Sequence, residues 1–461
     1  MTHVAVVGAY GSAGSSVASH LAERDVTLTL VDDGEPGGGL CILRGCMPSK
    51  EVLSAGAHRF QARHDDRLSG VPVPDLEAIV ARKDDHVEEF AAHRRAAIDR
   101  LTERDGVRLY REPARFVGDR RLQVGDRTLD PDYVVVATGS TVNVPDLPGL
   151  DGVPFETSAD VLDATAFPDS AVVMGFGTVG VELAPYLSEV GGVDVTVIEH
   201  DDRPLDEADD RFGDAVLDLY REAFDVEVVT NAFEERVERR GDGVRLHLDH
   251  DTVDHVDADT LCLFTGRRPA LDGLGLDATP VDPGPGWVED TMQARDAERT
   301  FVVGDANGRQ PVLHVAKEQG TLAAENILRH RDGRPLETYE SLYHRVIFAG
   351  LGVYPFARVG HSATSARAAG LDPIVVDRAA ADDGVFRTKD VPEGLARLVV
   401  GRDGTVLGYQ GLHYHADVMA KTLQVVVEDG ADVRSVPARA YHPTTPEILD
   451  GLVRAARSEL A

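Results

Sequence analysis

Residues 3–33 read "HVAVVGAYGSAGSSVASHLAERDVTLTLVDD" and combine an apolar run, a glycine-rich turn, a helical pattern and a second apolar run. The first run leads into Gly8, Gly11 and Gly14, and the second run ends at Asp32. This order predicts a βαβ unit, in which glycines let the backbone approach a pyrophosphate at a helix N-terminus and the acid accepts hydrogen bonds from a ribose. The glycine spacing carries one residue more than the regular Gly-x-Gly-x-x-Gly.

A second stretch repeats this unit with the regular spacing. Residues 171–200 read "AVVMGFGTVGVELAPYLSEVGGVDVTVIEH", with Gly175, Gly177 and Gly180 in the turn and Glu199 at the strand end. The acid follows the first glycine at the same distance in both stretches. Two matching units predict an α/β chain with two Rossmann-like dinucleotide-binding domains.

Further turns follow apolar strand patterns along the chain. Thr138 and Gly139 follow the run "DYVVVA", Gly266 follows "LCLFT", and Asp305 follows "RTFVVG". From about residue 336 onward, strand and helix patterns continue without a low-complexity linker. The order predicts one nucleotide domain interrupted by another and followed by an α/β C-terminal domain.

The composition is strongly acidic, with a formal net charge of −32 over 461 residues. Only five of the 47 basic residues are lysines, and the acids are spread over every segment. Such a surface is typical of salt-loving organisms, where salt screens the self-repulsion, and it argues against nucleic acid and anionic membranes as partners. No apolar run is long enough to span a bilayer, and the N-terminus lacks a signal-type pattern. We therefore expect a cytoplasmic protein.

Two of the three cysteines lie close together in "GGGLCILRGCMPSK", residues 37–50. In an undistorted helix the Cα atoms of Cys41 and Cys46 would be about 8.7 Å apart, whereas a disulfide needs about 4.4–6.8 Å. The pair is therefore either not bonded, or lies on a bent segment where it bonds and breaks at modest cost. So few cysteines do not make a structural disulfide framework, which favours a catalytic or metal-binding pair.

Two motifs add to the nucleotide signatures. The segment "CILRGCMPSK" at 41–50 is similar to a Cys-x4-Cys-x2-Ser-Lys redox motif, and "HPTTPEIL" at 442–449 is similar to a C-terminal His-Pro-Thr-x-x-Glu motif. On these residues the whole chain resembles the FAD-dependent pyridine nucleotide–disulfide oxidoreductases, the family of dihydrolipoamide dehydrogenase and glutathione reductase. The resemblance implies a discontinuous FAD-binding domain, an NAD(P)-binding domain and a C-terminal α+β dimerisation domain, expected at residues 1–148 with 270–335, 149–269 and 336–461.

The resemblance also gives roles to the residues of both motifs. It implies that Cys46, nearer the flavin, forms the thiolate–flavin charge-transfer pair and that Cys41 is the thiol that exchanges with substrate. His442 and Glu447 match the family's acid–base dyad, which serves the cysteines of the other subunit and so implies a homodimer. The alternatives for the cysteines are a structural bridge or half of a zinc site. Zinc would require further ligands, and Cys262 lies in an apolar strand pattern typical of a core.

Other matches concern the two cofactors, FAD and NAD. Lys50 and Glu182 match the family's ion pair beside the flavin N5 and the nicotinamide. A carboxylate at Glu199 accepts from a 2′-hydroxyl and repels a 2′-phosphate, which favours NAD, although Arg203 nearby leaves NADP open. The resemblance further implies that Asp32 and Asp305 bind the ribose and ribityl hydroxyls of FAD. It also implies that Thr138 and Gly139 line the flavin side.

Three positions bear on the substrate. Thr178 stands where glutathione reductases carry a tyrosine, which weakens that identification, and Ala440 stands where dihydrolipoamide dehydrogenases show a second histidine. Arg44, between the cysteines, either pairs with a carboxylate-bearing disulfide or points at the acidic solvent face. The C-terminal cysteine pair of mercuric reductases is missing.

We therefore expect an enzyme that passes electrons between NAD(H) and a small disulfide or dithiol, with lipoamide as the first candidate. A low-molecular-weight thiol disulfide of the γ-glutamylcysteine or glutathione type is the alternative substrate. A flavin-binding redox sensor with little turnover is a third interpretation. We expect no metal site, because His413 and His415 would share one face of a strand but lack a third ligand, which favours an interface or core role.

Overall fold

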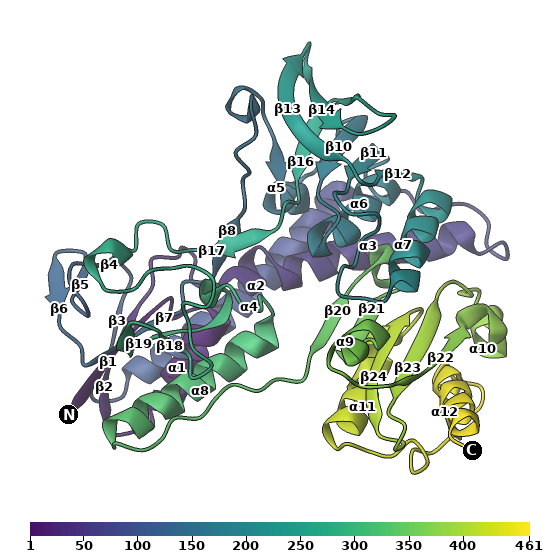
Figure 1. Cartoon of the computed structure of the whole chain (residues 1–461). Coiled ribbons are helices and arrows are strands. Elements are labelled where there is room, and N and C mark those ends of the chain that lie inside the picture. The colour runs from purple at the N-terminus through teal and green to yellow at the C-terminus, as the bar shows by residue number, and fades with distance from the viewer. The chain divides into compact units, whose positions relative to one another are not determined.

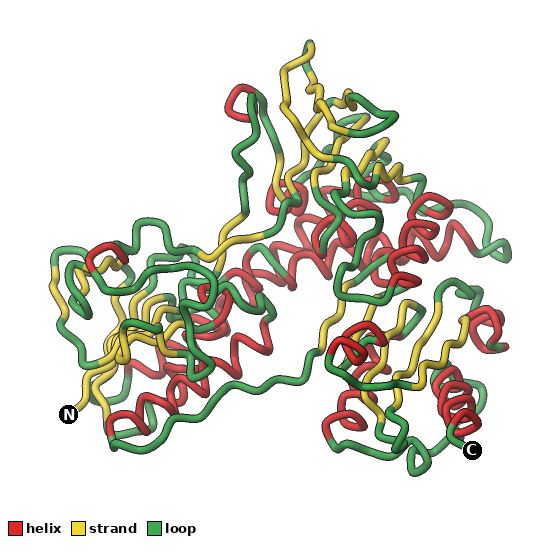
Figure 2. Tube along the Cα trace, viewed as in Figure 1, coloured by secondary structure: helices red, strands yellow, loops and turns green.

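The computed structural model describes residues 1–461 and divides into two compact units (Figures 1 and 2). The second unit holds the second nucleotide-binding stretch together with the C-terminal part of the chain. The three domain boundaries expected from the sequence stay a prediction. The first unit consists of Met1–Lys50, Ala81–Asn143 and Arg267–Ser341, and the second of Glu51–Val80, Val144–Gly266 and Leu342–Ala461.

The first unit is built on a mostly parallel six-stranded sheet. Only the two strands at one edge of the sheet, which come first in the spatial order below, are antiparallel to each other. The strands are, in spatial order, β18 (Gln293–Ala294), β19 (Ala297–Val302), β7 (Tyr133–Val136), β1 (Thr2–Val7), β2 (Val26–Val31) and β3 (Val107–Tyr110).

The two faces of this sheet bury alternate residues in separate cores. Val4 and Val6 of β1 pack with α1 (Ser12–Leu21) and α8 (Leu313–Arg331), two helices that lie side by side (Figure 1). Ala5 and Val7 belong to the opposite core. Because both faces are covered, the strands read as continuous apolar runs. The opposite core is closed by a three-stranded meander of β4 (Ala114–Phe116), β5 (Leu122–Val124) and β6 (Arg127–Leu129).

The nucleotide-binding part of the second unit has a fully parallel five-stranded sheet. Cys262 lies in one of these strands and is fully buried, as its apolar surroundings in the sequence predict. The strands are, in order, β12 (Val226–Val229), β11 (Asp194–Ile198), β10 (Ser170–Met174), β16 (Thr260–Leu263) and β9 (Glu156–Thr157). Its helices include α6 (Thr178–Glu189), α7 (Asp210–Ala223) and the short α5 (Ser158–Asp163). A separate three-stranded meander consists of β13 (Phe233–Arg240), β14 (Gly243–Asp249) and β15 (His255–Ala258).

The C-terminal part is an antiparallel five-stranded sheet with helices. The whole fold therefore has the expected class, two Rossmann-like sheets and a C-terminal α+β domain. The strands are, in order, β20 (His344–Ile347), β21 (Phe356–Gly360), β24 (Val406–Leu412), β23 (Leu395–Val400) and β22 (Ile374–Ala379). Long helices α11 (Ala416–Glu428) and α12 (Glu447–Glu459) pack on this sheet, and α9 (Ala363–Ala368) and α10 (Gly384–Thr388) are short.

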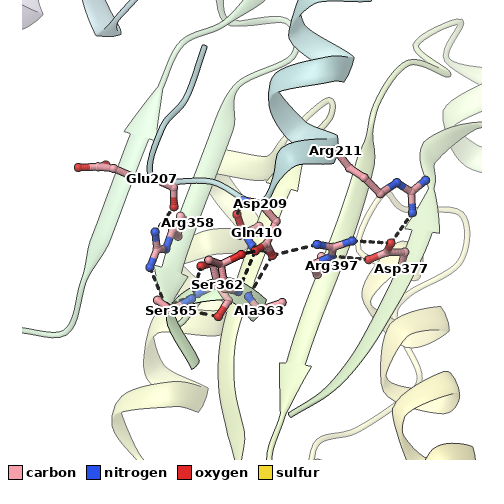
Figure 3. A network of polar contacts seen from close by, with 11 residues as sticks. Glu207, Asp209, Arg211, Arg358, Ser362, Ala363, Ser365, Asp377, Arg397 and Gln410 are labelled. Carbon is pink, nitrogen blue, oxygen red and sulfur yellow. Dashed lines mark hydrogen bonds and ion pairs between the residues drawn. The ribbon is translucent and has the colours of Figure 1, made fainter. Parts of the chain in front are cut away.

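A buried polar network joins the two parts of the second unit (Figure 3). The Asp209 carboxylate, at the start of α7, accepts hydrogen bonds from the backbone N–H groups of Ala363 and Thr364 at 3.0 Å. It also accepts from Gln410 at 2.6 Å and from Arg397 at 2.9 Å. Burial alone would raise the pKa of Asp209, but these hydrogen bonds lower it well below its usual value. The segment after β11 is thereby anchored to the C-terminal sheet.

Three arginines extend the network to further elements (Figure 3). Arg397 of β23 also bonds Asp377 of β22, which pairs in turn with Arg211 of α7. Arg358 of β21 donates to the backbone carbonyl of Glu207.

None of the helices in the structure combines the length and apolar character needed to cross a membrane.

Candidate active site

The two neighbouring cysteines lie on a bent segment of the first unit. Cys41 belongs to the single turn α2 (Leu40–Leu43), and Cys46 is the first residue of α3 (Cys46–His64). The two thiols are hydrogen-bonded to each other. A Cβ on Gly45 would lie only 3.1 Å from the Cys41 Cα, so glycine permits the close approach of the two turns. In the structure both thiols are free and lie on a bent segment, and the opening and closing of a disulfide between them stays a prediction.

The electrostatic surroundings of the two sulfurs differ. The hydrogen bond with the Cys46 side chain and burial raise the pKa of the Cys41 thiol, whereas the backbone N–H group of Cys46 and the Arg94 guanidinium act to lower it. Cys46 is exposed and begins a helix, where the unpaired N–H groups favour a thiolate. Arg94 is a functional candidate that the sequence analysis missed, because it lies 53 positions after Cys41 in the chain.

The first glycine turn forms a close-fitting cradle at the start of α1. Gly8 has φ +93°, and a Cβ there would lie 2.3 Å from the Ala137 carbonyl oxygen. A Cβ on Gly14 would lie 2.1 Å from the Gly8 oxygen. Gly11 caps the helix, and Asp32 accepts the N–H group of Tyr10 at 2.8 Å. Burial raises the pKa of Asp32. Only glycine fits at positions 8 and 14, and the turn leaves the backbone at the start of α1 open to a ligand.

The carboxyl ends of β7 and β19 add polar groups in the same unit. Ser140 donates to Asp305 at 2.7 Å and accepts from Arg267 at 2.9 Å. Gly139 has φ +73°, and the Thr138 hydroxyl is buried without a hydrogen-bond partner. Buried hydroxyl groups nearly always have a hydrogen-bond partner in folded proteins, so this one is suited to bind a polar group of a ligand. The first unit therefore offers a glycine cradle, an acid and an unsatisfied hydroxyl, which fit FAD.

The second glycine turn, in the second unit, has the same construction. Gly175 has φ +98°, and a Cβ there would lie 2.7 Å from the Phe264 oxygen. A Cβ on Gly180 would lie 2.2 Å from the Gly175 oxygen. Gly177 caps α6, and burial raises the pKa of Glu199 at the end of β11. Gly266, with φ +83°, follows the neighbouring strand β16. These residues fit a second dinucleotide.

The expected ion pair is divided between the units. Lys50 belongs to the first unit and donates to the Ser49 hydroxyl at 3.1 Å. Glu182 is buried in α6 of the second unit and accepts the backbone N–H group of Phe348 at 3.1 Å. Their pairing stays a prediction.

The histidine and glutamate of the C-terminal motif are in contact. His442 Nδ1 lies 2.9 Å from Glu447 Oε1, and Glu447 also accepts the backbone N–H group of Thr444. The His442 side chain is 79% exposed, whereas that of Glu447 is 25% exposed. The carboxylate is therefore fixed by the start of α12, and it orients an imidazole that remains accessible.

The histidine pair of the sequence analysis does not lie on a strand. β24 ends at Leu412, so the expected alternation of His413 and His415 on a strand face is wrong. His413 is buried against Tyr409, and burial lowers its pKa to about 4. His415 has φ +67° before α11 and hydrogen-bonds Thr445, inside the C-terminal motif, at 3.1 Å. No group of three histidine, cysteine or acidic side chains is arranged to hold a metal.

Comparisons with known proteins agree with this geometry. Residues 2–320 match the family model described as pyridine nucleotide-disulphide oxidoreductase, and residues 345–452 match its dimerisation domain. A dihydrolipoyl dehydrogenase from Halobacterium salinarum is 28% identical over 97% of this chain and 94% of its own. Dihydrolipoyl dehydrogenase 2 from Haloarcula marismortui is 29% identical over 99% and 97%. Both organisms are salt-loving, in agreement with the charge of this chain.

Solved structures share the fold. The flavoprotein disulfide reductase RclA from Escherichia coli, in its Cu(II) complex, superposes with a TM-score of 0.84 at 21% identity, covering 98% of this chain and 99% of its own. LpdA from Mycobacterium tuberculosis superposes with a TM-score of 0.83 at 22% identity over the full length of both chains. With the matched family models, these findings identify the chain as a member of the pyridine nucleotide-disulphide oxidoreductases, FAD-dependent enzymes that pass electrons between NAD(P)H and disulfides.

Proposed function

We propose that the chain transfers electrons between NAD(H) and a small dithiol or disulfide through Cys41 and Cys46, as a dihydrolipoyl dehydrogenase. The observation that carries the proposal is the contact of the two thiols on a bend, in the same unit as the first glycine cradle. A hydrogen-bonded pair on a bent segment suits a disulfide that opens and closes during turnover. Both relatives described above carry the same activity in their names.

The thiol chemistry divides into two balanced exchanges. A thiolate of the dihydrolipoyl substrate attacks the Cys41 sulfur of the Cys41–Cys46 disulfide, forms a mixed disulfide and releases Cys46 as a thiolate. The second substrate thiol then loses its proton and attacks the first substrate sulfur, which releases Cys41. The substrate leaves as a disulfide, and two electrons remain on the enzyme dithiol.

Proton transfer is assigned to the C-terminal dyad. His442 would accept the proton of the second substrate thiol, and Glu447 would hold the imidazole in position and stabilise its charged form. We assign the dyad to the cysteines of a second copy of this chain, so that the working enzyme is a homodimer. Residues 345–452 support this arrangement, since they match the family's dimerisation domain.

The two glycine cradles are assigned to the cofactors. The FAD phosphates and ribose would be held by Gly8, Gly11, Gly14 and Asp32. The ribityl chain and the flavin side would be contacted by Asp305, Thr138 and Gly139. FAD, when bound, would relay the electron pair between the dithiol and the nicotinamide. Lys50 and Glu182 would pair beside the flavin and the nicotinamide.

The second dinucleotide would be held by the turn residues Gly175, Gly177, Gly180 and Gly266. Glu199 would select NAD by accepting a hydrogen bond from its 2′-hydroxyl. We place the enzyme in the cytoplasm.

Arg44 supports a second candidate, a reductase of carboxylate-bearing disulfides. It is exposed between the two cysteines and forms no ion pair in a strongly acidic chain. An arginine free to bind a carboxylate would favour a disulfide of the γ-glutamylcysteine type. In that case the exchanges above run in reverse, with Cys41 attacking the substrate disulfide.

A substrate panel tests the two candidates in molar KCl. We expect rapid NAD+ reduction with dihydrolipoamide, little activity with glutathione disulfide, and no change in the KM for dihydrolipoamide in Arg44→Gln. Faster turnover of bis-γ-glutamylcystine with NADH or NADPH, with a KM that rises in Arg44→Gln, would replace the first candidate with the second. If NADH reduced the flavin but no substrate turned over, both would be wrong and a sensor role would remain.

A further inference from the structure

Arg94 of α4 (Leu76–Thr102) has a position that the proposed function has not used. Its guanidinium donates to the backbone carbonyl of Tyr10 at 2.9 Å and to the hydroxyl of Ser15 at 3.1 Å. Tyr10 is one of the two residues between the first glycines of the longer turn, and Ser15 lies in the first turns of α1. The arginine is therefore fixed beside the start of α1.

The redox segment packs against the same place. A Cβ on Gly39 would lie 2.9 Å from the Gly11 Cα and 3.1 Å from the Tyr10 oxygen. Cys41 follows two residues later, and its thiol lies within electrostatic range of the Arg94 guanidinium. A hydrogen bond to the Tyr10 carbonyl thus fixes a cation near the sulfur assigned to substrate exchange.

The charge of Arg94 is not compensated by an acid. No carboxylate lies within ion-pairing distance of Arg94, which is half-buried in a chain with 79 acidic residues. Its neighbour Arg95, also half-buried on α4, pairs with Glu88 and donates to the Gly37 carbonyl instead. Hydrogen bonds to neutral oxygens hold the guanidinium in place but leave its positive charge available to a developing anion.

We propose that Arg94 is a positioning residue whose positive charge stabilises the thiolate of Cys41 during exchange with the substrate. The inference rests on the proposed function, in which Cys41 is the sulfur that meets the substrate. When the substrate thiolate leaves the mixed disulfide by forming its own disulfide bond, Cys41 takes the electron pair of the broken bond. In the reverse direction the Cys41 thiolate attacks a substrate disulfide, forms the mixed disulfide and expels one substrate thiolate.

The groups that face the Cys41 sulfur have opposite effects on its ionisation. The hydrogen bond with the Cys46 side chain, followed by burial, raises the pKa of Cys41, whereas the backbone N–H group of Cys46 and then Arg94 of α4 lower it. Tyr10, on the glycine turn, directs its phenol to Arg111 at 3.0 Å instead. Arg94 is therefore the cation that favours the thiolate, and its loss should make the thiol harder to ionise.

The test measures alkylation of Cys41 by iodoacetamide as a function of pH, by mass spectrometry, in holoenzyme reduced with an excess of phosphine. In Arg94→Gln we expect the midpoint of the rate profile to rise by about half to one pH unit, and the rate at pH 7 to fall about three- to tenfold. Arg94→Lys keeps the charge and should restore most of the rate. Arg95→Gln, the matched control, should keep the wild-type midpoint.

The failure of this inference differs from the failure of the proposed function. If Cys46 rather than Cys41 reacts first in the wild type, the role assigned to Cys41 is wrong. If Cys41 reacts first but Arg94→Gln keeps the wild-type midpoint, or Arg95→Gln shifts it equally, only the Arg94 inference is overturned. Should Arg94→Gln lose its flavin, Arg94→Lys carries the test: it should keep a midpoint close to that of the wild type, and a rise of a full pH unit with the positive charge still present would overturn the inference.

Discussion

The two glycine turns solve the same problem with different numbers of residues. In both, a first glycine at positive φ (Gly8 at +93°, Gly175 at +98°) leaves no room for a Cβ beside a neighbouring strand end. In both, a later glycine packs on the carbonyl of the first, with a hypothetical Cβ at 2.1 Å for Gly14 and 2.2 Å for Gly180. The extra residue of the first turn changes neither contact.

The two turns differ in the contacts that Tyr10 makes in the longer turn. The backbone N–H group of Tyr10 donates to Asp32, its carbonyl accepts from Arg94, and its phenol bonds Arg111. The longer turn is thereby tied to the strand-end acid and to α4, beside the redox segment, whereas the regular turn leads directly from Gly175 to the Gly177 cap of α6. The bonds of Tyr10 therefore join the longer turn to α4, beside the redox segment, and leave its glycine contacts intact.

Substitution of one glycine in each turn should have the largest effect, and each substitution should weaken the binding of a different cofactor. Gly14→Ala would place a Cβ against the Gly8 carbonyl, and we expect loss of the bound flavin. Gly180→Ala makes the equivalent clash with Gly175 in the second unit, so it should keep the flavin and weaken NADH binding more than tenfold. Flavin absorbance after gel filtration and NADH fluorescence measure the two losses. If Gly180→Ala lost its flavin, or Gly14→Ala kept it, the assignment of the turns to the two cofactors would be wrong.

A smaller effect is expected at the acid of the second turn. Burial raises the pKa of Glu199, so this carboxyl becomes protonated at a higher pH than a free glutamate. NADH affinity should therefore decline on acidification as the carboxylate loses an acceptor for the ribose. Glu199→Gln should bind NADH several-fold more weakly at pH 7.5, accept NADPH more readily, and lose this pH dependence. An equal pH dependence in wild type and variant, measured by fluorescence titration, would exclude Glu199 as its source.

The smallest effect concerns the side chain of Tyr10 in the longer turn. Tyr10→Phe removes only the hydrogen bond to Arg111, which is partly solvent-exposed, and should lower the free energy of unfolding by about 0.5–1.5 kcal/mol. The backbone contacts of residue 10 remain, so flavin binding should be unchanged. Denaturant unfolding with flavin fluorescence measures both quantities. Flavin loss in this variant would show that the phenol, and not the backbone, holds the longer turn.

Local patterns in the sequence predicted most of the fold. The apolar runs that became β1, β2, β10 and β11 were recognisable, because strands buried on both faces read as continuous apolar stretches. The glycines fixed the starts of α1 and α6. The strand expected around His413 was too long, since the chain leaves β24 at Leu412 and His415 adopts a left-handed conformation. Alternation in the sequence does not reveal where a strand yields to a turn.

The site was predicted less completely than the fold. Motif spacing brought Cys41 to Cys46 and His442 to Glu447, contacts made within five residues along the chain. Arg94 and the buried Asp209 network depend on contacts between distant segments, and one surface-type arginine or aspartate looks like any other in an acidic sequence. Long-range pairing of this kind follows from tertiary packing and leaves no local signal.

The central claim is that electrons pass through the Cys41–Cys46 pair. The most direct measurement is NAD+ reduction by dihydrolipoamide in molar KCl, for the wild type, Cys41→Ser, Cys46→Ser and the core control Cys262→Ser. We predict rapid turnover in the wild type and in Cys262→Ser, and a loss of at least a thousandfold in each of the other two, with the flavin retained. Comparable turnover in the wild type and in either active-site variant would contradict the account.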